Sequence, residues 1–306
     1  MMNNEDKFRA GLVPIIGRPN VGKSTLINSL TGSKLSIVTP KAQTTRRRIL
    51  GVLNKDNYQI VFADTPGVID PAYELHNRMM KQVKKALSDA DVILFMTEPK
   101  DNIAAWAEKP LKTYVDLIQE TGMPVIIMIN KIDTVTKDQV EALRLQWEQW
   151  LNSKFSEGKV VVGSALTGEG LDQLLEVIVG FLPYSHPLFP PDQITDITER
   201  LWVAEIIREK IFLHYRQEVP YSTEVIVTDW LDKENITVIK AEIIVERDSQ
   251  KKILIGKGGS AIKKIGIEAR REIEQMLGKK VYLELFVKVK RDWRERNDYL
   301  KYLGYE

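Results

Sequence analysis

Short apolar runs alternate with longer amphipathic stretches from the N-terminus to about residue 180. The runs with the length and composition of buried strands are Pro14–Gly17, Gln59–Ala63, Val92–Met96, Val125–Ile129 and Val160–Gly163. This alternation predicts an α/β domain in which helices cover both faces of a mostly parallel sheet. Each run ends at or just before a polar motif. Because open α/β sheets bind ligands at the carboxyl ends of their strands, we expect the functional site there.

The pattern changes after Pro183–Pro191, which carries four prolines in nine positions and cannot continue a helix. The elements expected beyond it are a helix at Asp196–Leu213, strands at Glu224–Asp229 and Ile236–Val245, a charged helix ending near Met276, and a strand at Val281–Val289. These elements are typical of a compact α+β domain. We therefore expect a first domain at residues 1–180, a proline-rich linker at 181–197 and a second, smaller domain at 198–306.

Composition limits the class of protein. Of the 306 residues, 43% are hydrophobic and 28% are charged, and no apolar run approaches the roughly 18 residues of a membrane span. The polar N-terminus, Met1–Lys7, predicts that no signal peptide is present. The absence of cysteine excludes disulfides and thiolate chemistry and is compatible with a reducing cytoplasm. The three histidines lie too far apart in sequence to form a metal-ligand spacing.

Charge is distributed unevenly along the chain. The formal net charge is only +2, yet Lys251–Arg291 holds twelve basic and four acidic residues, a local excess of eight positive charges. Such a basic segment in a nearly neutral chain predicts a nucleic-acid contact in the second domain.

The stretch Gly17–Ser24 fits the phosphate-binding pattern G-x-x-x-x-G-K-S at every fixed position. It lies between a predicted strand and a predicted helix, as the motif requires. Its glycines let backbone N–H groups wrap phosphates, and the helix N-terminus adds a positive dipole end. We expect Lys23 to reach the β- and γ-phosphates and Ser24 to ligate Mg²⁺. The nucleotide-binding residues expected here are Gly17, Arg18, Pro19, Asn20, Val21, Gly22, Lys23, Ser24 and Thr25.

Two further segments complete the phosphate side of the expected site. The residues Asp64, Thr65, Pro66 and Gly67 have the form D-x-x-G. The Asp64 carboxylate can hold Mg²⁺ through a water and the Gly67 N–H can bond the γ-phosphate, although such a tetrapeptide alone is more often a plain turn. The polar, basic segment Thr39–Arg48 predicts a mobile loop, from which we favour Thr45, with Thr44 as the alternative, to complete the Mg²⁺ ligands. Whether its arginines contact a phosphate backbone or only solvent stays open.

The run Asn130–Asp133 distinguishes guanine from adenine nucleotides. The Asp133 carboxylate can accept two hydrogen bonds, from the ring N–H and the exocyclic amine of guanine, and adenine offers no such pair. The run therefore predicts GTP rather than ATP, with large selectivity. After the strand Val160–Gly163, one tripeptide is expected to give a backbone N–H to the guanine carbonyl oxygen. The base-side residues expected are Asn130, Lys131, Asp133, Ser164, Ala165 and Leu166.

These four motifs, in this order, resemble the translation-factor-like class of P-loop GTPases over about residues 10–180. In the Ras-like pattern a glutamine after the D-x-x-G glycine orients the attacking water, but here that place is Val68, which cannot hydrogen-bond water. We therefore expect a low intrinsic rate. Similar GTPases with asparagine at the place of Asn20 bind a K⁺ ion that acts as an arginine finger, so the resemblance implies Asn20 as a K⁺ ligand. The catalytic residues expected are Asn20, Lys23, Thr45, Asp64 and Gly67.

A second glycine-rich loop lies within Ile255–Ile265 and has the G-x-x-G form that marks a KH module. Its glycines let a nucleic-acid backbone come close and its lysines neutralise phosphate. Another phosphate loop or a simple helix break would give the same glycines, but the local charge excess and the flanking isoleucines favour RNA binding. Because the glycines let bases pass without side-chain obstruction, single-stranded RNA fits better than duplex. The RNA-binding residues expected are Ile255, Gly256, Lys257, Gly258, Gly259, Lys263 and Lys264.

A GTPase domain, a proline-rich linker and a C-terminal KH domain together resemble the Era family of ribosome-assembly GTPases over nearly the whole chain. The resemblance implies binding to the 3′ end of small-subunit 16S ribosomal RNA during maturation of the 30S subunit, with the GTP form competent for RNA. It also implies Mg²⁺ and K⁺ as cofactors and a cytoplasmic location with peripheral contact to the inner face of the cell membrane. Two alternatives remain: an RNA-binding assembly factor with incidental hydrolysis, and a tRNA-modifying GTPase, which the lack of cysteine and the KH-like part disfavour.

Overall fold

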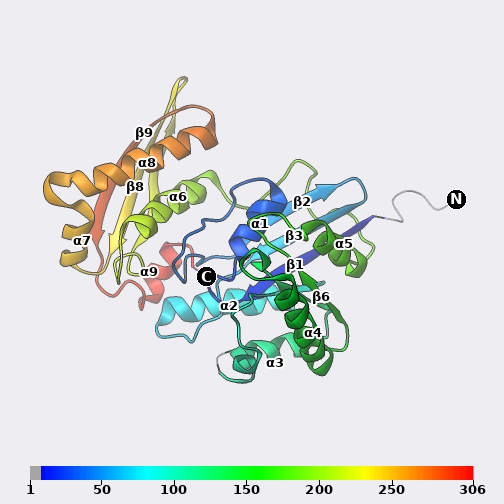
Figure 1. Cartoon of the computed structure of the whole chain (residues 1–306). Helices are drawn as coiled ribbons and strands as arrows, with labels where there is room; N and C mark the ends of the chain where they lie inside the picture. The colour runs from blue at the N-terminus through cyan, green and yellow to red at the C-terminus, as the bar shows by residue number, and fades with distance from the viewer. Residues whose placement is uncertain (1–7, 110, 306) are drawn as a thin grey trace. The chain divides into compact units, whose positions relative to one another are not determined.

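The computed structural model describes residues 8–109 and 111–305. The N-terminal stretch from which we predict the absence of a signal peptide lies outside these residues. The chain divides into two compact units (Figure 1). The first takes the residues up to Ser36, Thr45–Ala72 and His76–Asp196, and the second takes Ile37–Thr44, Tyr73–Leu75 and the chain from Ile197 onward.

The first unit is built on a six-stranded sheet of order β2-β3-β1-β4-β5-β6. The strands are β1 (Arg9–Gly17), β2 (Ile49–Lys55), β3 (Tyr58–Asp64), β4 (Ile93–Thr97), β5 (Val125–Ile129) and β6 (Gly158–Val162). Strand β2 runs antiparallel to β3, and the other neighbours are parallel. This is the mostly parallel sheet that the alternation predicts.

Helices lie on both faces of this sheet (Figure 1). They are α1 (Lys23–Thr31), α2 (Glu74–Ser88), α3 (Leu111–Thr121), α4 (Lys137–Lys154) and α5 (Leu171–Phe181), with short 3₁₀ turns η2 (Ile103–Ala107) and η3 (Ile132–Thr134). Every residue of β4 and β5 is buried, because helices cover both sides of these central strands. No helix within the described part of the chain is long and apolar enough to cross a membrane.

The strand register brings the carboxyl ends of the central strands together. Gly17 at the end of β1 lies opposite Met96 of β4, and Thr97 at the end of β4 lies opposite Ile129 of β5. On the other side of β1, Asp64 at the end of β3 lies opposite Ile15. The motifs that follow these strands therefore meet at one edge of the sheet.

The sequence pattern missed some of these elements. Strand β2 falls just after the segment predicted as a mobile loop. Its apolar run is broken by Gly51 and Asn54, and it is held by antiparallel pairing to β3. The segment expected as an interdomain linker runs along the first unit, where Tyr184 bridges to Arg9 and Thr195 bridges to Gly51.

The second unit packs helices on one side of a three-stranded sheet of order β7-β8-β9. Its elements are α6 (Glu199–His214), β7 (Glu224–Asp232), β8 (Ile236–Val245), α7 (Asp248–Ile255), the turn η4 (Lys257–Gly259), α8 (Ser260–Leu277), β9 (Lys280–Val289) and α9 (Asn297–Tyr302). β7 and β8 are antiparallel, and β8 and β9 are parallel. The short helix α9 is another element that the pattern did not predict.

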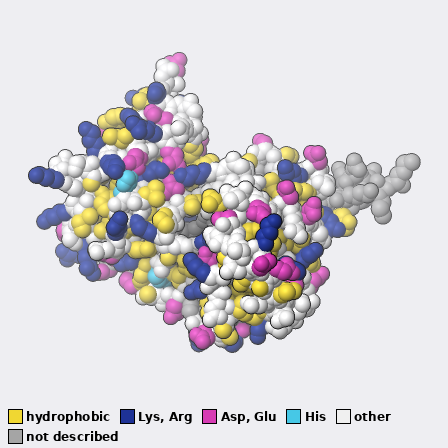
Figure 2. All heavy atoms as spheres, in the orientation of Figure 1, with side chains coloured by type: hydrophobic (Ala, Val, Ile, Leu, Met, Phe, Trp, Pro, Cys, Tyr) yellow, Lys and Arg dark blue, Asp and Glu magenta, His cyan; other side chains and the backbone are white. Residues whose placement is uncertain are grey.

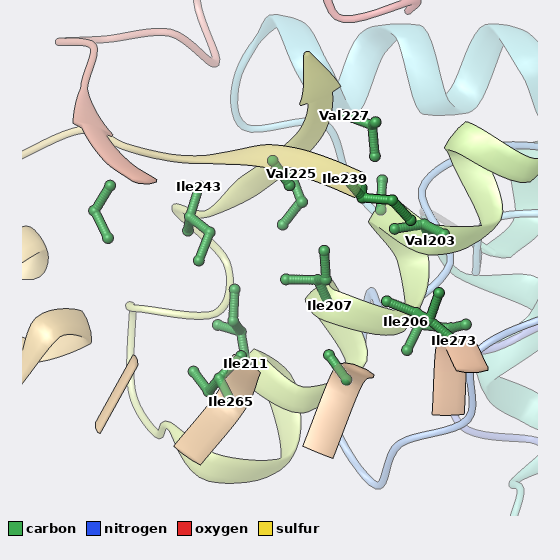
Figure 3. Close-up of a cluster of buried hydrophobic side chains, with 14 of the residues drawn as sticks. Val203, Ile206, Ile207, Ile211, Val225, Val227, Ile239, Ile243, Ile265 and Ile273 are labelled. Atoms are coloured by element: carbon green, nitrogen blue, oxygen red, sulfur yellow. The ribbon is translucent and has the colours of Figure 1, made fainter. Parts of the chain in front are cut away.

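Alternate residues of the strands form the core of this unit with α6 and α8. Figure 3 shows Ile239 and Ile243 of β8 among side chains from α6, such as Ile207 and Ile211, and from α8, such as Ile265. These side chains are 1% exposed or less, and burial on this scale is the main stabilising contribution to such a domain.

Helix α6 also buries charge. Arg208 is 0% exposed, and its Nε donates to Glu205 Oε1 at 2.9 Å. A buried guanidinium without such a partner would strongly destabilise the fold. The ion pair therefore allows α6 to be buried on almost every side.

Candidate nucleotide-binding and RNA-binding sites

The phosphate loop joins β1 to α1, and its shape depends on Gly22. This residue has φ 108°, and a Cβ there would lie 2.3 Å from Nδ2 of Asn130. Both the backbone conformation and the close approach of Asn130 therefore require glycine. Asn130 uses this approach to donate from Nδ2 to the Val21 carbonyl at 2.8 Å.

Lys23 lies inside the loop, with only 6% of its surface exposed. Its Nζ donates to the carbonyl oxygens of Gly17 and Arg18, each at 3.1 Å. Burial lowers the pKa of Lys23 from 10.5 to about 8, and the negative charge of Asp64 opposes this effect. The loop thus holds an ammonium group that would gain from an anionic ligand.

Three oxygen-bearing side chains gather beside the lysine. Ser24 Oγ donates to Asp64 Oδ2 at 2.6 Å and lies 3.0 Å from Thr45 Oγ1. The second carboxylate oxygen, Asp64 Oδ1, is buried and has no hydrogen-bond partner within the described part of the chain. Burial raises the pKa of Asp64, opposed by the hydrogen bond from Ser24 and the charge of Lys23. Hydroxyl and carboxylate oxygens with an unpaired buried acceptor fit Mg²⁺.

The structure brings Thr45 rather than Thr44 to this cluster. Thr44 Oγ1 donates to the Lys41 carbonyl at 2.7 Å and lies 2.6 Å from Thr39 Oγ1. Thr44 and Thr45 also fall in different compact units. The geometry therefore supports the favoured threonine over its alternative.

The D-x-x-G segment lies against the phosphate loop. Thr65 Oγ1 donates to the Ile15 carbonyl at 2.7 Å, and the Val68 N–H donates to the Gly17 carbonyl at 3.3 Å. A Cβ on Gly67 would lie 3.0 Å from the backbone of Pro19, so the two segments are in close contact. Val68 is 4% exposed, and its side chain has no group that could orient water.

Asn130 and Lys131 connect the base-side motifs to the phosphate loop. Asn130 Oδ1 accepts from the Ala165 N–H at 2.8 Å, and Lys131 Nζ donates to the Asn20 carbonyl at 2.7 Å. Asp133 lies in the turn η3 and is exposed, and Leu166 is 78% exposed. The expected phosphate and base motifs are thus brought together at the carboxyl edge of the sheet.

Two acidic residues in this site were not predicted. Glu98 Oε2 accepts from Lys131 Nζ at 2.6 Å, and Asp101 Oδ1 accepts from Arg18 Nη1 at 3.2 Å. Glu98 follows β4 directly and Asp101 lies three residues further on. A polar segment after a buried strand of an α/β sheet was the available signal.

The predicted RNA-binding loop joins α7 to α8. Gly258 has φ 60°, and a Cβ there would meet no atom within 4 Å. The glycine is therefore needed for the left-handed backbone, while the surface above it stays open to a ligand. Lys257 lies in the loop, and Lys263 and Lys264 lie in the first turns of α8. Figure 2 shows Lys and Arg side chains gathered on the surface of this unit.

A shallow groove of about 290 Å³ runs between α8 and β9. Its lining residues are Ile262, Lys263, Gly266, Ile267, Arg270, Tyr282, Leu283 and Leu285. Only Lys263 among these was predicted. Tyr282 is 53% exposed, and a large aromatic residue at an outward position of an alternating strand was the signal for it.

Known protein families cover both units. A family described as 50S ribosome-binding GTPase matches residues 12–131, and the KH domain family matches residues 218–294. Among curated proteins, the chain is 45% identical over 303 residues to GTPase Era of Geotalea uraniireducens (strain Rf4), covering 99% of each chain. It is 43% identical over 304 residues to GTPase Era of Geobacter sp. (strain M21), covering 99% of this chain and 100% of that protein.

Solved structures agree with these matches. Era in complex with MgGDPNP and nucleotides 1506–1542 of 16S ribosomal RNA is similar, with a TM-score of 0.90 and 43% identity over 97% of this chain and 99% of that chain. Aquifex aeolicus Era Y63A bound to GDP·AlF₄⁻ matches with the same TM-score, 44% identity and the same coverage. The assembled GTPase motifs, the KH domain and identity over almost the full length lead to one conclusion: the chain belongs to the Era family of GTPases.

Proposed function

We propose that this protein is a GTP-hydrolysing switch that binds the 3′ end of 16S ribosomal RNA and assists assembly of the 30S subunit. The observation that carries this proposal is the match, over 97% of the chain, to an Era structure that holds both MgGDPNP and a segment of 16S ribosomal RNA. The nucleotide site and the G-x-x-G loop of this chain are the two sites that such a switch needs.

The phosphate side of the reaction is assigned to Lys23 and the oxygen cluster. The Lys23 ammonium, now bonded to loop carbonyls, stabilises the negative charge of the β- and γ-phosphates. Ser24, Thr45 and Asp64 would hold Mg²⁺, which when bound neutralises charge on the phosphate oxygens. The Gly67 N–H, beside the phosphate loop, is assigned to the γ-phosphate.

The base side is assigned to the Asn130–Asp133 run and the tripeptide Ser164–Leu166. Asp133 accepts the two guanine donors, and Asn130 fixes Ala165 and Val21 relative to each other through its side-chain amide. A carboxylate left unpaired by the wrong base loses binding free energy, so the site selects GTP over ATP.

Hydrolysis needs a replacement for the missing glutamine, because Val68 cannot orient water. We assign Asn20 as a ligand of a K⁺ ion, which when bound supplies positive charge to the transition state. Asn20 lies in the phosphate loop with φ 65°, and Lys131 bonds its carbonyl. This hydrogen bond holds Asn20 in one backbone conformation within the phosphate loop.

RNA binding is assigned to the second unit. The open backbone of Gly258 admits a phosphate backbone, and the lysines at 257, 263 and 264 neutralise it. Tyr282 and the apolar lining of the groove beside α8 offer surfaces on which bases can pack. We assign the protein to the cytoplasm, where ribosomal subunits assemble, with peripheral contact to the inner membrane face through its basic surface.

The test is RNA binding in two nucleotide states. A labelled RNA carrying the 16S 3′ end is titrated with the full chain loaded with either GDPNP or GDP. We expect the GDPNP form to bind more tightly and the RNA to change the rate of GTP hydrolysis. Equal affinity in both states, with no effect of RNA on hydrolysis, would favour the alternative of an assembly factor with incidental hydrolysis.

Charge reversal separates specific contacts from general electrostatics. Lys257→Glu with Lys263→Glu is expected to weaken RNA binding and lower its salt dependence, since each lost phosphate contact reduces the slope of log affinity against log salt by about 0.7 for a single strand. Lys84→Glu with Lys154→Glu, at exposed positions of α2 and α4 in the first unit, changes the charge by the same amount and is the matched control. If the double variant bound RNA as the wild type does, the assigned interface would be wrong.

A further inference from the structure

The segment after β4 is a short acidic turn that closes on itself. Asp101 Oδ2 accepts from Thr97 Oγ1 at 3.0 Å and from the Glu98 N–H at 3.2 Å, and the Asp101 N–H donates to the Glu98 carbonyl at 2.9 Å. The Glu98 and Asp101 side chains are only 8% and 4% exposed. The turn is therefore a rigid support for two carboxylates.

Each carboxylate holds a basic side chain of the nucleotide site. Asp101 pairs with Arg18 of the phosphate loop at 3.2 Å. Glu98 pairs with Lys131 at 2.6 Å, and the same Lys131 Nζ donates to the Asn20 carbonyl at 2.7 Å. A continuous chain of contacts therefore runs from the turn, through the base-specificity motif, to the backbone of the phosphate loop.

The phosphate loop needs such support because the carbonyl that Lys131 binds belongs to a residue with an unusual backbone conformation. Asn20 has a left-handed backbone with φ 65°, which costs free energy in a residue other than glycine. Lys131 stabilises it only if its ammonium stays in place, and the flexible lysine side chain would otherwise sample other rotamers. Glu98 is the group that restricts it.

We propose that Glu98 is a positioning residue for guanine nucleotides: its carboxylate holds Lys131 on the Asn20 carbonyl and so fixes the phosphate loop in its binding conformation. The inference rests on the nucleotide site proposed above. Glu98 touches neither the phosphate-binding groups nor the base-binding carboxylate directly, so its effect passes through Lys131. Burial opposes ionisation, but the hydrogen bonds from Lys100 and Lys131 hold the pKa of Glu98 below its ordinary value, which keeps the carboxylate charged at neutral pH.

A double-mutant cycle tests this inference. The full chain is loaded with a fluorescent N-methylanthraniloyl GDP and chased with excess GDP, and the release rate is measured for the wild type, Glu98→Gln, Lys131→Met and the double variant. A hydrogen bond to a charged group contributes enough that its loss should speed release roughly tenfold in Glu98→Gln. The double variant should release GDP no faster than Lys131→Met alone, because the carboxylate acts through the lysine.

Two further variants make the outcome specific. Lys100→Met removes the other partner of Glu98, an exposed lysine at 2.8 Å, and should leave release within about twofold of the wild type. Glu98→Asp keeps the charge and should release GDP more slowly than Glu98→Gln. Thermal unfolding curves identify a variant that has lost its fold.

The outcomes separate this inference from the proposed function. If the wild type bound no guanine nucleotide, the nucleotide site itself would be wrong. If the wild type bound GDP but Glu98→Gln released it at the wild-type rate, the positioning role would be refuted. Effects of Glu98→Gln and Lys131→Met that multiply in the double variant, or equal rates for the Gln and Asp variants, would refute it as well.

Discussion

Nucleotide binding by this chain should take up a proton at Lys23. Burial lowers the pKa of this lysine from 10.5 to about 8, while bound phosphate would stabilise its charged form and raise the pKa again. The perturbation is a change of pH from 7.5 to 8.5, a range in which the GDP phosphates are almost fully ionised and the guanine ring keeps its proton.

The size of the effect follows from the pKa. With a pKa of about 8, roughly a quarter of the free protein lacks the Lys23 proton at pH 7.5 and roughly three-quarters lacks it at pH 8.5. The number of protons taken up per bound GDP should therefore rise from roughly a quarter at pH 7.5 to roughly three-quarters at pH 8.5, and the affinity for GDP should fall roughly threefold. The folding stability of the free protein should change with pH in the opposite direction to the affinity, because a buried charged lysine destabilises the fold below pH 8. That cost declines as the pH rises from about 8 toward 10.5.

Isothermal titration calorimetry measures this uptake directly. GDP is titrated into the full chain at each pH in two buffers with different ionisation enthalpies, and the difference in heat gives the number of protons. Lys100→Met serves as the control, because this exposed lysine has its pKa raised by hydrogen bonding to Glu98 and does not titrate in this range. Uptake that stayed constant between the two pH values would refute the role of Lys23.

Three further predictions test other parts of the molecule. Asp133→Asn should shift preference from GTP toward xanthosine triphosphate in a competition assay, and an unchanged ratio would contradict the base-recognition argument. Replacing K⁺ with Na⁺ should slow phosphate release from GTP, whereas equal rates would remove the role assigned to Asn20. Glu205→Ala removes the carboxylate that accepts hydrogen bonds from buried Arg208 and should lower the free energy of unfolding by about 3–5 kcal/mol in a denaturant titration. Glu141→Ala, which breaks an exposed pair, should have a much smaller effect, and equal losses in the two variants would contradict the importance of burial.

The parts of the fold that could be predicted are those where one periodicity dominates. The run Val125–Ile129 is a strand with those bounds, and Ile236–Val245 is another, because each is a continuous or alternating apolar run closed by polar residues. Strand β2 could not be predicted in this way, since Gly51 and Asn54 interrupt its apolar pattern. The strand is stabilised by its antiparallel pairing with β3, which the pattern does not show. Helix α9 is only six residues long, too short for a helical period to be recognised.

The residues of the site also fall into those that the sequence predicted and those that it did not. Gly22, Lys23 and Asn130 could be predicted because nucleotide chemistry demands those residue types at fixed spacing. Glu98 and Tyr282 were not predicted, because the roles proposed for them depend on which elements lie beside them in space. A glutamate after a strand and a tyrosine in a strand are common in sequences. The proposed role of Glu98 follows from its contact with Lys131, and that of Tyr282 follows from its place in the groove beside α8.

The phosphate loop itself links the two kinds of residue. Lys23 bonds the carbonyls of Gly17 and Arg18, Lys131 bonds that of Asn20, and Asn130 bonds that of Val21. Two of these three side chains belong to the run to which we assign guanine recognition. We therefore expect base selectivity and phosphate affinity to change together in this site. A change at Asn130 or Lys131 should therefore loosen the loop assigned to the phosphates, and a wrong base that displaces either residue should do the same. Discrimination between nucleotides should for this reason appear in phosphate binding and hydrolysis as well as in base affinity.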